Sequence, residues 1–165
     1  MQSVSLRNKW VSLRGGTKIK DLNEKDVLYV KGKFFTVTRK KFVQDLEGNT
    51  LFTVRNKFWR LFAYKAYVYD KDNQRVAFIR RKIFSFHDRY FIDCKYGKLE
   101  IMGNILTFDY HIKLDDKEIG HVSRRISLRD SFVLDLEDGY DLAFYCALVI
   151  AIDNITDQRR QDASN

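Results

Sequence analysis

The chain has three histidines, His87, His111 and His121, and each is a residue type that can bind a metal or transfer a proton. None of them has a second His or a Cys at the short spacing that zinc sites usually show. The two cysteines, Cys94 in a strand-like run and Cys146 in an apolar run, are too differently placed to predict a disulfide framework. We therefore expect free buried thiols, no metal and no cofactor.

Sequence motifs for catalysis are also missing. No run matches the nucleophile elbow of serine hydrolases, the phosphate-binding P-loop or the dinucleotide fingerprint. The aspartates fall mostly in predicted turns, where their side chains stabilise the backbone. We therefore assign no catalytic residue and interpret the protein as not an enzyme.

Basic residues are the most suggestive feature for binding. Residues 1–82 hold 20 Lys and Arg against 7 Asp and Glu, a charge of +13, whereas residues 83–165 hold 10 against 15, a charge of −5. The candidates for holding anionic lipid headgroups are Arg39, Lys40, Lys41, Arg55, Lys57, Arg60, Arg80, Arg81 and Lys82. The same charges would also suit nucleic acid, with Tyr64, Tyr67 or Tyr90 as stacking partners for bases. A solvated basic face that binds no ligand is the plainer alternative.

These basic residues belong to an internal repeat. A basic or amide residue recurs at intervals of 21 to 25 residues, as Lys9, Lys33, Lys57, Lys82, Asn104 and Arg125. The residues five and three positions before it and one position after it are apolar or small, so they share one face of a strand and should point inward. The residue directly before it breaks the apolar pattern in every unit, which predicts a bulge or a bend there.

Turn-forming clusters separate the strands of this repeat, at residues 21–25, 45–49, 70–73, 96–98 and 115–117. Each unit is long enough for two strands, so six hairpin units predict about twelve antiparallel strands. A sheet of that many alternating strands should close on itself, because closure removes exposed edges. The sequence therefore predicts an all-β fold built as a closed barrel.

The end of the chain predicts one helix, over about residues 140–156. Residues 142–152 are apolar on every side, yet they are far fewer than the roughly 20 needed to cross a bilayer. A helix that is apolar all round must be buried on all sides, so the barrel should enclose it. Asp138 and Asp141 suit the helix N-terminus. We expect a single domain over residues 1–157 and a polar tail, residues 158–165, that frays.

A barrel of hairpins that ends in a buried apolar helix resembles the LURP-one-related family, in particular its bacterial branch. The segments that carry the resemblance are KWVSL at 9–13, YVKGKFFTV at 29–37, QDLEGNTL at 44–51, RKIFSF at 81–86 and ALVIAID at 147–153. Trp59 and Arg60 depart from the repeat, where an aromatic residue followed by Ser or Thr is expected. The resemblance implies the tubby C-terminal fold, shared with phospholipid scramblases, and no settled chemistry; relatives bind phosphoinositides or act at membranes.

The acidic segment 130–138 resembles the segment that scramblases use for calcium. On a strand, however, Asp130 and Asp135 would lie on opposite faces, whereas calcium needs several oxygens converging at one point. We interpret these residues as turn and helix-entry acids.

Together these features predict a non-catalytic binding or scaffold module that attaches peripherally to an anionic phospholipid surface or to a protein partner. A scramblase-like phospholipid-handling protein and a nucleic-acid-binding protein are the alternatives. The first nine residues lack an apolar signal region, so we expect a cytoplasmic location, peripheral at the membrane, without a transmembrane segment.

Overall fold

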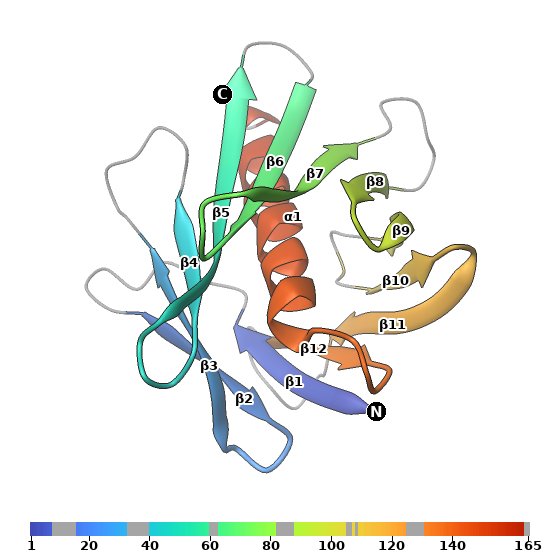
Figure 1. Ribbon diagram of the computed structural model, residues 1–165. Coiled ribbons are helices and arrows are strands. Elements are labelled where there is room, and N and C mark those ends of the chain that lie inside the picture. The colour runs from blue at the N-terminus through green and yellow to red at the C-terminus, as the bar shows by residue number, and fades with distance from the viewer. Residues whose placement is uncertain are drawn as a thin grey trace.

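The computed structural model describes residues 1–7, 16–32, 40–59, 63–81, 88–104, 107, 109–124 and 131–163. Twelve antiparallel strands form a closed barrel around a single helix, as predicted (Figure 1). The elements are β1 (Gln2–Arg7), β2 (Thr17–Asp21), β3 (Asp26–Gly32), β4 (Lys41–Gln44), β5 (Thr50–Trp59), β6 (Ala63–Asp70), β7 (Arg75–Arg81), β8 (Asp88–Cys94), β9 (Gly97–Asn104), β10 (Asp109–Leu114), β11 (Lys117–Arg124), β12 (Ser131–Leu136) and α1 (Leu142–Ala163).

The first and last strands close the barrel. Leu134 of β12 pairs with Val4 of β1 on one side and with Val122 of β11 on the other. Every other strand pairs with its neighbours in sequence, so the sheet is a meander of hairpins closed into a ring. Closure gives every strand a hydrogen-bonded neighbour on both sides.

The predicted inward face is confirmed at the two offsets before the recurring residue. The residues three positions before the recurring residue are all buried, namely Leu6, Val30, Val54, Ile79, Ile101 and Val122. Five positions before it, Val4, Leu28, Ala77 and Leu99 are buried, and Phe52 and Gly120 are partly buried. The side chains one position after it lie outside the described residues.

A bulge or a bend was predicted directly before the recurring residue, and at the described positions no bulge occurs there. At Asn56 the β5–β6 ladder runs without a shift, and register shifts occur instead near the turns, on the extra residues Val27, Leu51, Val76 and Ile119. Asn56 shows why the apolar pattern breaks in its own unit. Its side chain points inward, is fully buried, and donates a hydrogen bond to the backbone carbonyl of Ala151 in α1, 3.0 Å away. A polar partner on the helix, not a bulge, explains the polar residue there.

The predicted turn aspartates stabilise their turns. One oxygen each of Asp21, Asp45 and Asp70 accepts hydrogen bonds from the backbone N–H groups two and four residues further on, at 2.8–3.0 Å. The side chain of Asn49 also donates to Asp45 and lowers the pKa of that carboxyl group. These carboxylates therefore serve the backbone, as the sequence predicted.

Helix α1 fills the barrel (Figure 1). Asp141 caps it by accepting a hydrogen bond from the N–H of Phe144 at 3.1 Å, and residues 143–156 are buried. The helix continues to Ala163, beyond the predicted end at 156, where a fraying tail was expected. Arg159 helps to hold this last part, because its side chain pairs with Asp88 of β8 at 2.9 Å. In the described part of the chain, no helix combines the length and the apolarity that crossing a membrane requires.

Both cysteines are free thiols, as expected, although only Cys146 is fully buried and Cys94 is partly exposed. Burial raises the pKa of both thiols.

Candidate anionic-ligand surface

Three neighbouring strands, β5, β6 and β7, bring cations together on the outside of the barrel. Side chains alternate between the two faces of a strand. The neighbours of Lys57, Lys65 and Arg80 are buried against the helix, so the side chains of these three cations point to solvent. The register aligns them, because Lys57 lies opposite Lys65 and Lys65 lies opposite Arg80. The result is a row of three cations across three strands.

A second row of side chains lies beside the first. Arg55 lies opposite Tyr67, and Tyr67 lies opposite Phe78. The rings of Tyr67 and Phe78 stack with their centroids 5.0 Å apart and an angle of 17° between their planes. We call the six residues of the two rows, Arg55, Lys57, Lys65, Tyr67, Phe78 and Arg80, the β5–β7 face.

The aromatic rings of this face contact three of its four cations, whereas the guanidinium group of Arg55 lies over the ring of Tyr69, 4.7 Å from its centroid, and donates a hydrogen bond to Asn73. The Lys57 ammonium lies 5.5 Å from the Tyr67 ring centroid, and Lys65 and Arg80 lie 5.9 and 5.6 Å from that of Phe78. Contacts of this kind contribute about 0.5–1 kcal/mol at exposed sites. They orient the apolar stems along the rings while the charges stay in water.

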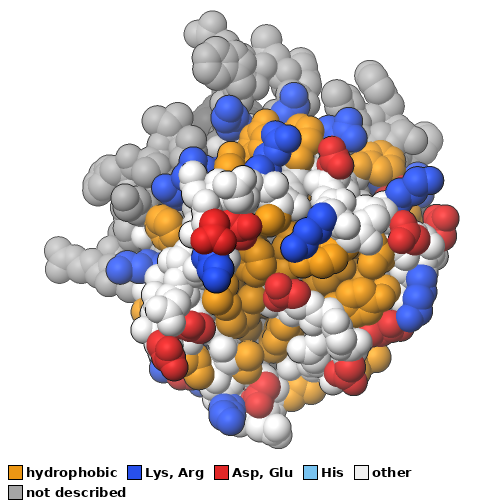
Figure 2. Space-filling model, viewed as in Figure 1, with side chains coloured by type: hydrophobic (Ala, Val, Ile, Leu, Met, Phe, Trp, Pro, Cys, Tyr) orange, Lys and Arg blue, Asp and Glu red, His pale blue; other side chains and the backbone are white. Residues whose placement is uncertain are grey.

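The charges of the face are not balanced locally. Among the described residues, Lys57, Lys65 and Arg80 make no ion pair with a carboxylate. Like charges directly opposite one another on a sheet destabilise it, so an anionic partner would remove this penalty. The face ends at β8, where Asp93 lies opposite Phe78. In Figure 2, Lys and Arg side chains gather among hydrophobic ones in the upper part of the view.

Not all predicted binding residues join this face. Arg81 lies at the barrel rim, where its guanidinium group pairs with Asp88 at 2.9 Å, and Arg159 of the helix pairs with the same carboxylate. The Lys40 ammonium lies 5.4 Å from the ring centroid of Phe42, which is in β4. Lys40 and Lys41 also make other interactions. Arg39, Arg60 and Lys82 lie outside the described residues.

The tyrosines predicted as stacking partners for bases lie in different parts of the structure. Tyr67 lies on the β5–β7 face, whereas Tyr90 is fully buried, so its prediction as a stacking partner for a base was wrong. The side chain of Tyr64 lies outside the described residues. Lys65 and Phe78 were missed because they lie outside the basic runs. Hairpin register was the signal that could have found them, since it places Lys65 opposite Lys57.

The acidic segment before α1 is engaged within the protein. Asp135 accepts a hydrogen bond from Ser3, Asp138 pairs with the N-terminal amino group, and Glu137 pairs with Lys117. Glu137 and Asp138 lie in the turn before the helix, as expected, whereas Asp135 lies on strand β12 and Asp130 lies outside the described residues.

Comparison with known proteins decides the family. The sequence matches the LURP-one-related family over residues 3–153, nearly the whole chain. The chain belongs to the LURP-one-related family. This LURP-one-related barrel also resembles a solved protein from Arabidopsis thaliana with a TM-score of 0.65 and 16% sequence identity, covering 94% of this chain and 91% of the plant protein. That likeness concerns the fold alone. A comparison with curated proteins found no match.

Proposed function

We propose that this LURP-one-related protein is a non-catalytic binding module whose β5–β7 face attaches to an anionic phospholipid surface. The observation that carries the proposal is the row of Lys57, Lys65 and Arg80, three adjacent cations that no carboxylate among the described residues neutralises. Phosphate groups of lipid headgroups supply the missing negative charge.

The expected strength of this attachment follows from the number of cations. Each Lys or Arg near an anionic membrane contributes about 1 kcal/mol, so the three cations of the row and Arg55 contribute about 4 kcal/mol at low salt. A binding free energy of that size corresponds to a dissociation constant of about 1 mM. The face alone therefore gives weak, reversible, salt-sensitive attachment, which is the behaviour of a peripheral protein.

A scramblase-like activity receives less support. It would need a segment that moves into the lipid, and residues 143–156 of α1 form the centre of the barrel core. Withdrawing the helix would expose that core, so we assign lipid contact to the outside of the sheet.

The test compares two triple variants by co-sedimentation with vesicles. Lys57→Glu/Lys65→Glu/Arg80→Glu reverses the row, and Lys25→Glu/Lys95→Glu/Lys113→Glu makes the same change of charge elsewhere on the barrel. We expect the native chain to bind phosphatidylserine vesicles at low salt and to dissociate at high salt. The first variant should lose about a hundredfold or more in affinity, because at least three contributions of about 1 kcal/mol disappear.

The matched variant controls for net charge and should lose much less. Equal losses in the two variants would show that total charge, not this face, determines binding. No binding of the native chain to anionic vesicles at low salt would remove the lipid proposal and favour a protein partner.

Single-stranded nucleic acid is a second candidate, favoured by the stacked pair of Tyr67 and Phe78 among the cations. Aromatic rings beside cations can bind the bases of single strands by stacking. Fluorescence anisotropy with a labelled oligonucleotide tests it. Tyr67→Leu, which keeps all the cations, should then weaken oligonucleotide binding while leaving vesicle binding nearly unchanged.

A further inference from the structure

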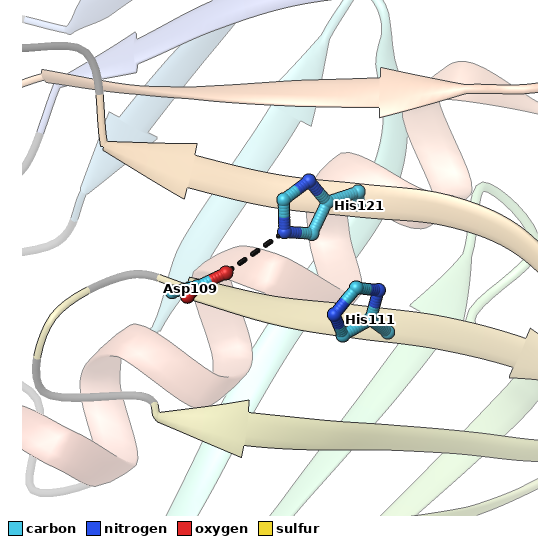
Figure 3. Close-up of side chains that lie close together, drawn as sticks. All are labelled: Asp109, His111 and His121. Carbon is cyan, nitrogen blue, oxygen red and sulfur yellow. Dashed lines mark hydrogen bonds and ion pairs between the residues drawn. The ribbon is translucent and has the colours of Figure 1, made fainter.

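Two histidines that are ten positions apart in the sequence lie side by side on the barrel. His111 of β10 is directly opposite His121 of β11, and their rings stack with centroids 4.5 Å apart. Asp109 lies two residues before His111 on the same face, and its carboxylate contacts Nε2 of His121 at 2.9 Å. Figure 3 shows the three side chains gathered on one side of the hairpin. The potential ligand atoms of the three residues all lie within 4.8 Å of one another.

A register shift adds a fourth group to this cluster. If the hairpin were regular, the pairing of His111 with His121 would place Glu118 opposite Leu114, on the inner face of the sheet. The shift between Ile112 and Lys113 instead makes Ile119 the extra residue and places Glu118 opposite Lys113, on the outer face with His111. Nδ1 of His111 contacts the Glu118 carboxylate at 2.9 Å.

We propose that Asp109, His111 and His121 form a surface site for a divalent transition-metal ion of the zinc class, with Glu118 orienting His111. Two imidazoles and one carboxylate are a ligand set that zinc accepts. Calcium and magnesium favour sites made of oxygen ligands and should not compete.

The distances fit such an ion. Two ligand atoms each about 2.0–2.1 Å from zinc at a tetrahedral angle lie about 3.3 Å apart. Nε2 of His121 and the Asp109 carboxylate are already close to that spacing, at 2.9 Å. The ligand atoms of the three residues lie within 4.8 Å of one another, and small side-chain rotations would bring them to the zinc spacing. The side chains are 34–67% exposed, so a metal ion reaches them from solvent.

Glu118 has the role that carboxylates have beside metal-bound histidines. Because Nδ1 of His111 contacts Glu118, Nε2 of the same ring remains for the metal. Such a contact fixes the ring orientation and makes the imidazole a better ligand. Three protein ligands leave the fourth tetrahedral position to water or to an exchangeable anion. The site lies on β10 and β11, away from the β5–β7 face, and does not depend on the function proposed for that face.

The experiment is isothermal titration of the full chain with Zn²⁺. A Cys94→Ser background removes the partly exposed thiol, which is a competing zinc ligand. We expect saturable binding of one equivalent. His111→Asn and His121→Asn should each lower the affinity by about a hundredfold or more, because removing a ligand costs more than the roughly 10–100-fold loss of an outer partner. Glu118→Ala should lower it by about tenfold.

His87→Asn is the matched control, since it removes the remaining histidine and should leave the affinity unchanged. Circular dichroism of each variant verifies folding, and NMR gives an independent reading in the native sequence. Substoichiometric paramagnetic Co²⁺ should broaden the ring signals of His111 and His121 before those of His87. Equal zinc affinity in the Cys94→Ser chain with and without the His111→Asn or His121→Asn change, loss of binding in His87→Asn, or no saturable binding would each overturn the proposal.

Discussion

The contact between Asn56 and the helix offers a sharp test of how the barrel holds its core. Asn56 is fully buried, donates to the carbonyl of Ala151 at 3.0 Å, and accepts a hydrogen bond from the side-chain amide of Asn154 at 2.9 Å. Asn154 is itself only 2% exposed. We predict that Asn56→Ala lowers the free energy of unfolding by about 2–4 kcal/mol.

The magnitude follows from what the substitution leaves behind. Each buried polar group that loses its partner costs about 1–3 kcal/mol, and the Asn154 amide loses its partner at Asn56 in a place that water does not reach. Because a domain of this kind is stable by roughly 5–15 kcal/mol, the loss is a large part of the total. Asn154→Ala should cost a similar amount. The double variant should cost less than the sum by about 1–2 kcal/mol, because each single change already removes the shared hydrogen bond.

Urea unfolding followed by circular dichroism measures these free energies for the native chain, both single variants and the double variant. Asn23→Ala is a matched control, since it makes the same change in an exposed turn and should stay within about 0.5 kcal/mol of the native chain. A loss below about 0.5 kcal/mol for Asn56→Ala, or strict additivity in the double variant, would refute the inferred contact between wall and helix.

Three further predictions concern the buried interior. Ala147→Glu places a carboxylate in the fully buried part of the helix and should lower the free energy of unfolding by several kcal/mol, so soluble expression should be lost. A soluble variant with an unchanged thermal melt would contradict the enclosed helix. Burial and the nearby Asp153 raise the pKa of Tyr110 well above 10.0 in the folded protein. As the pH rises, the unfolded chain therefore loses the Tyr110 proton before the folded protein does. Above about pH 10 the free energy of unfolding should then fall by about 1.4 kcal/mol per pH unit. Tyr110→Phe should remove that part of the slope in urea titrations at high pH, and an unchanged slope would contradict the argument. An aromatic disulfide reagent should modify Cys94 in the folded protein but Cys146 only on unfolding, and equal rates for both thiols would disagree with their burial.

Much of the architecture could be predicted because it follows from side-chain periodicity. Apolar residues at the two inward offsets and turn clusters between them define hairpins, and hairpins of that number favour closure. The helix was recognisable because residues 142–152 are apolar all round and only a barrel interior can cover them. Its continuation to Ala163 was missed, because tertiary contacts such as that of Arg159 with Asp88 hold polar residues in the helix.

The sites were harder to predict because they depend on register. A local basic run does not reveal which strands meet, so Lys65 was missed and Arg81, which turns toward Asp88, was included. The pairing of His111 with His121 requires the exact alignment of one hairpin, and the position of Glu118 requires a shift of one residue within it. Neither is visible in residue spacing alone.

Lysine footprinting with mass spectrometry tests the proposed binding face most directly, because it uses the native chain. The protein is acetylated briefly, alone and with phosphatidylserine or neutral phosphatidylcholine vesicles. We predict that anionic vesicles at low salt slow the modification of Lys57 and Lys65, while Lys25 and Lys113 react as before and neutral vesicles protect none of the four. Protection of Lys25 and Lys113 with continued reaction of Lys57 and Lys65 would show that another surface meets the lipid and would contradict the proposal.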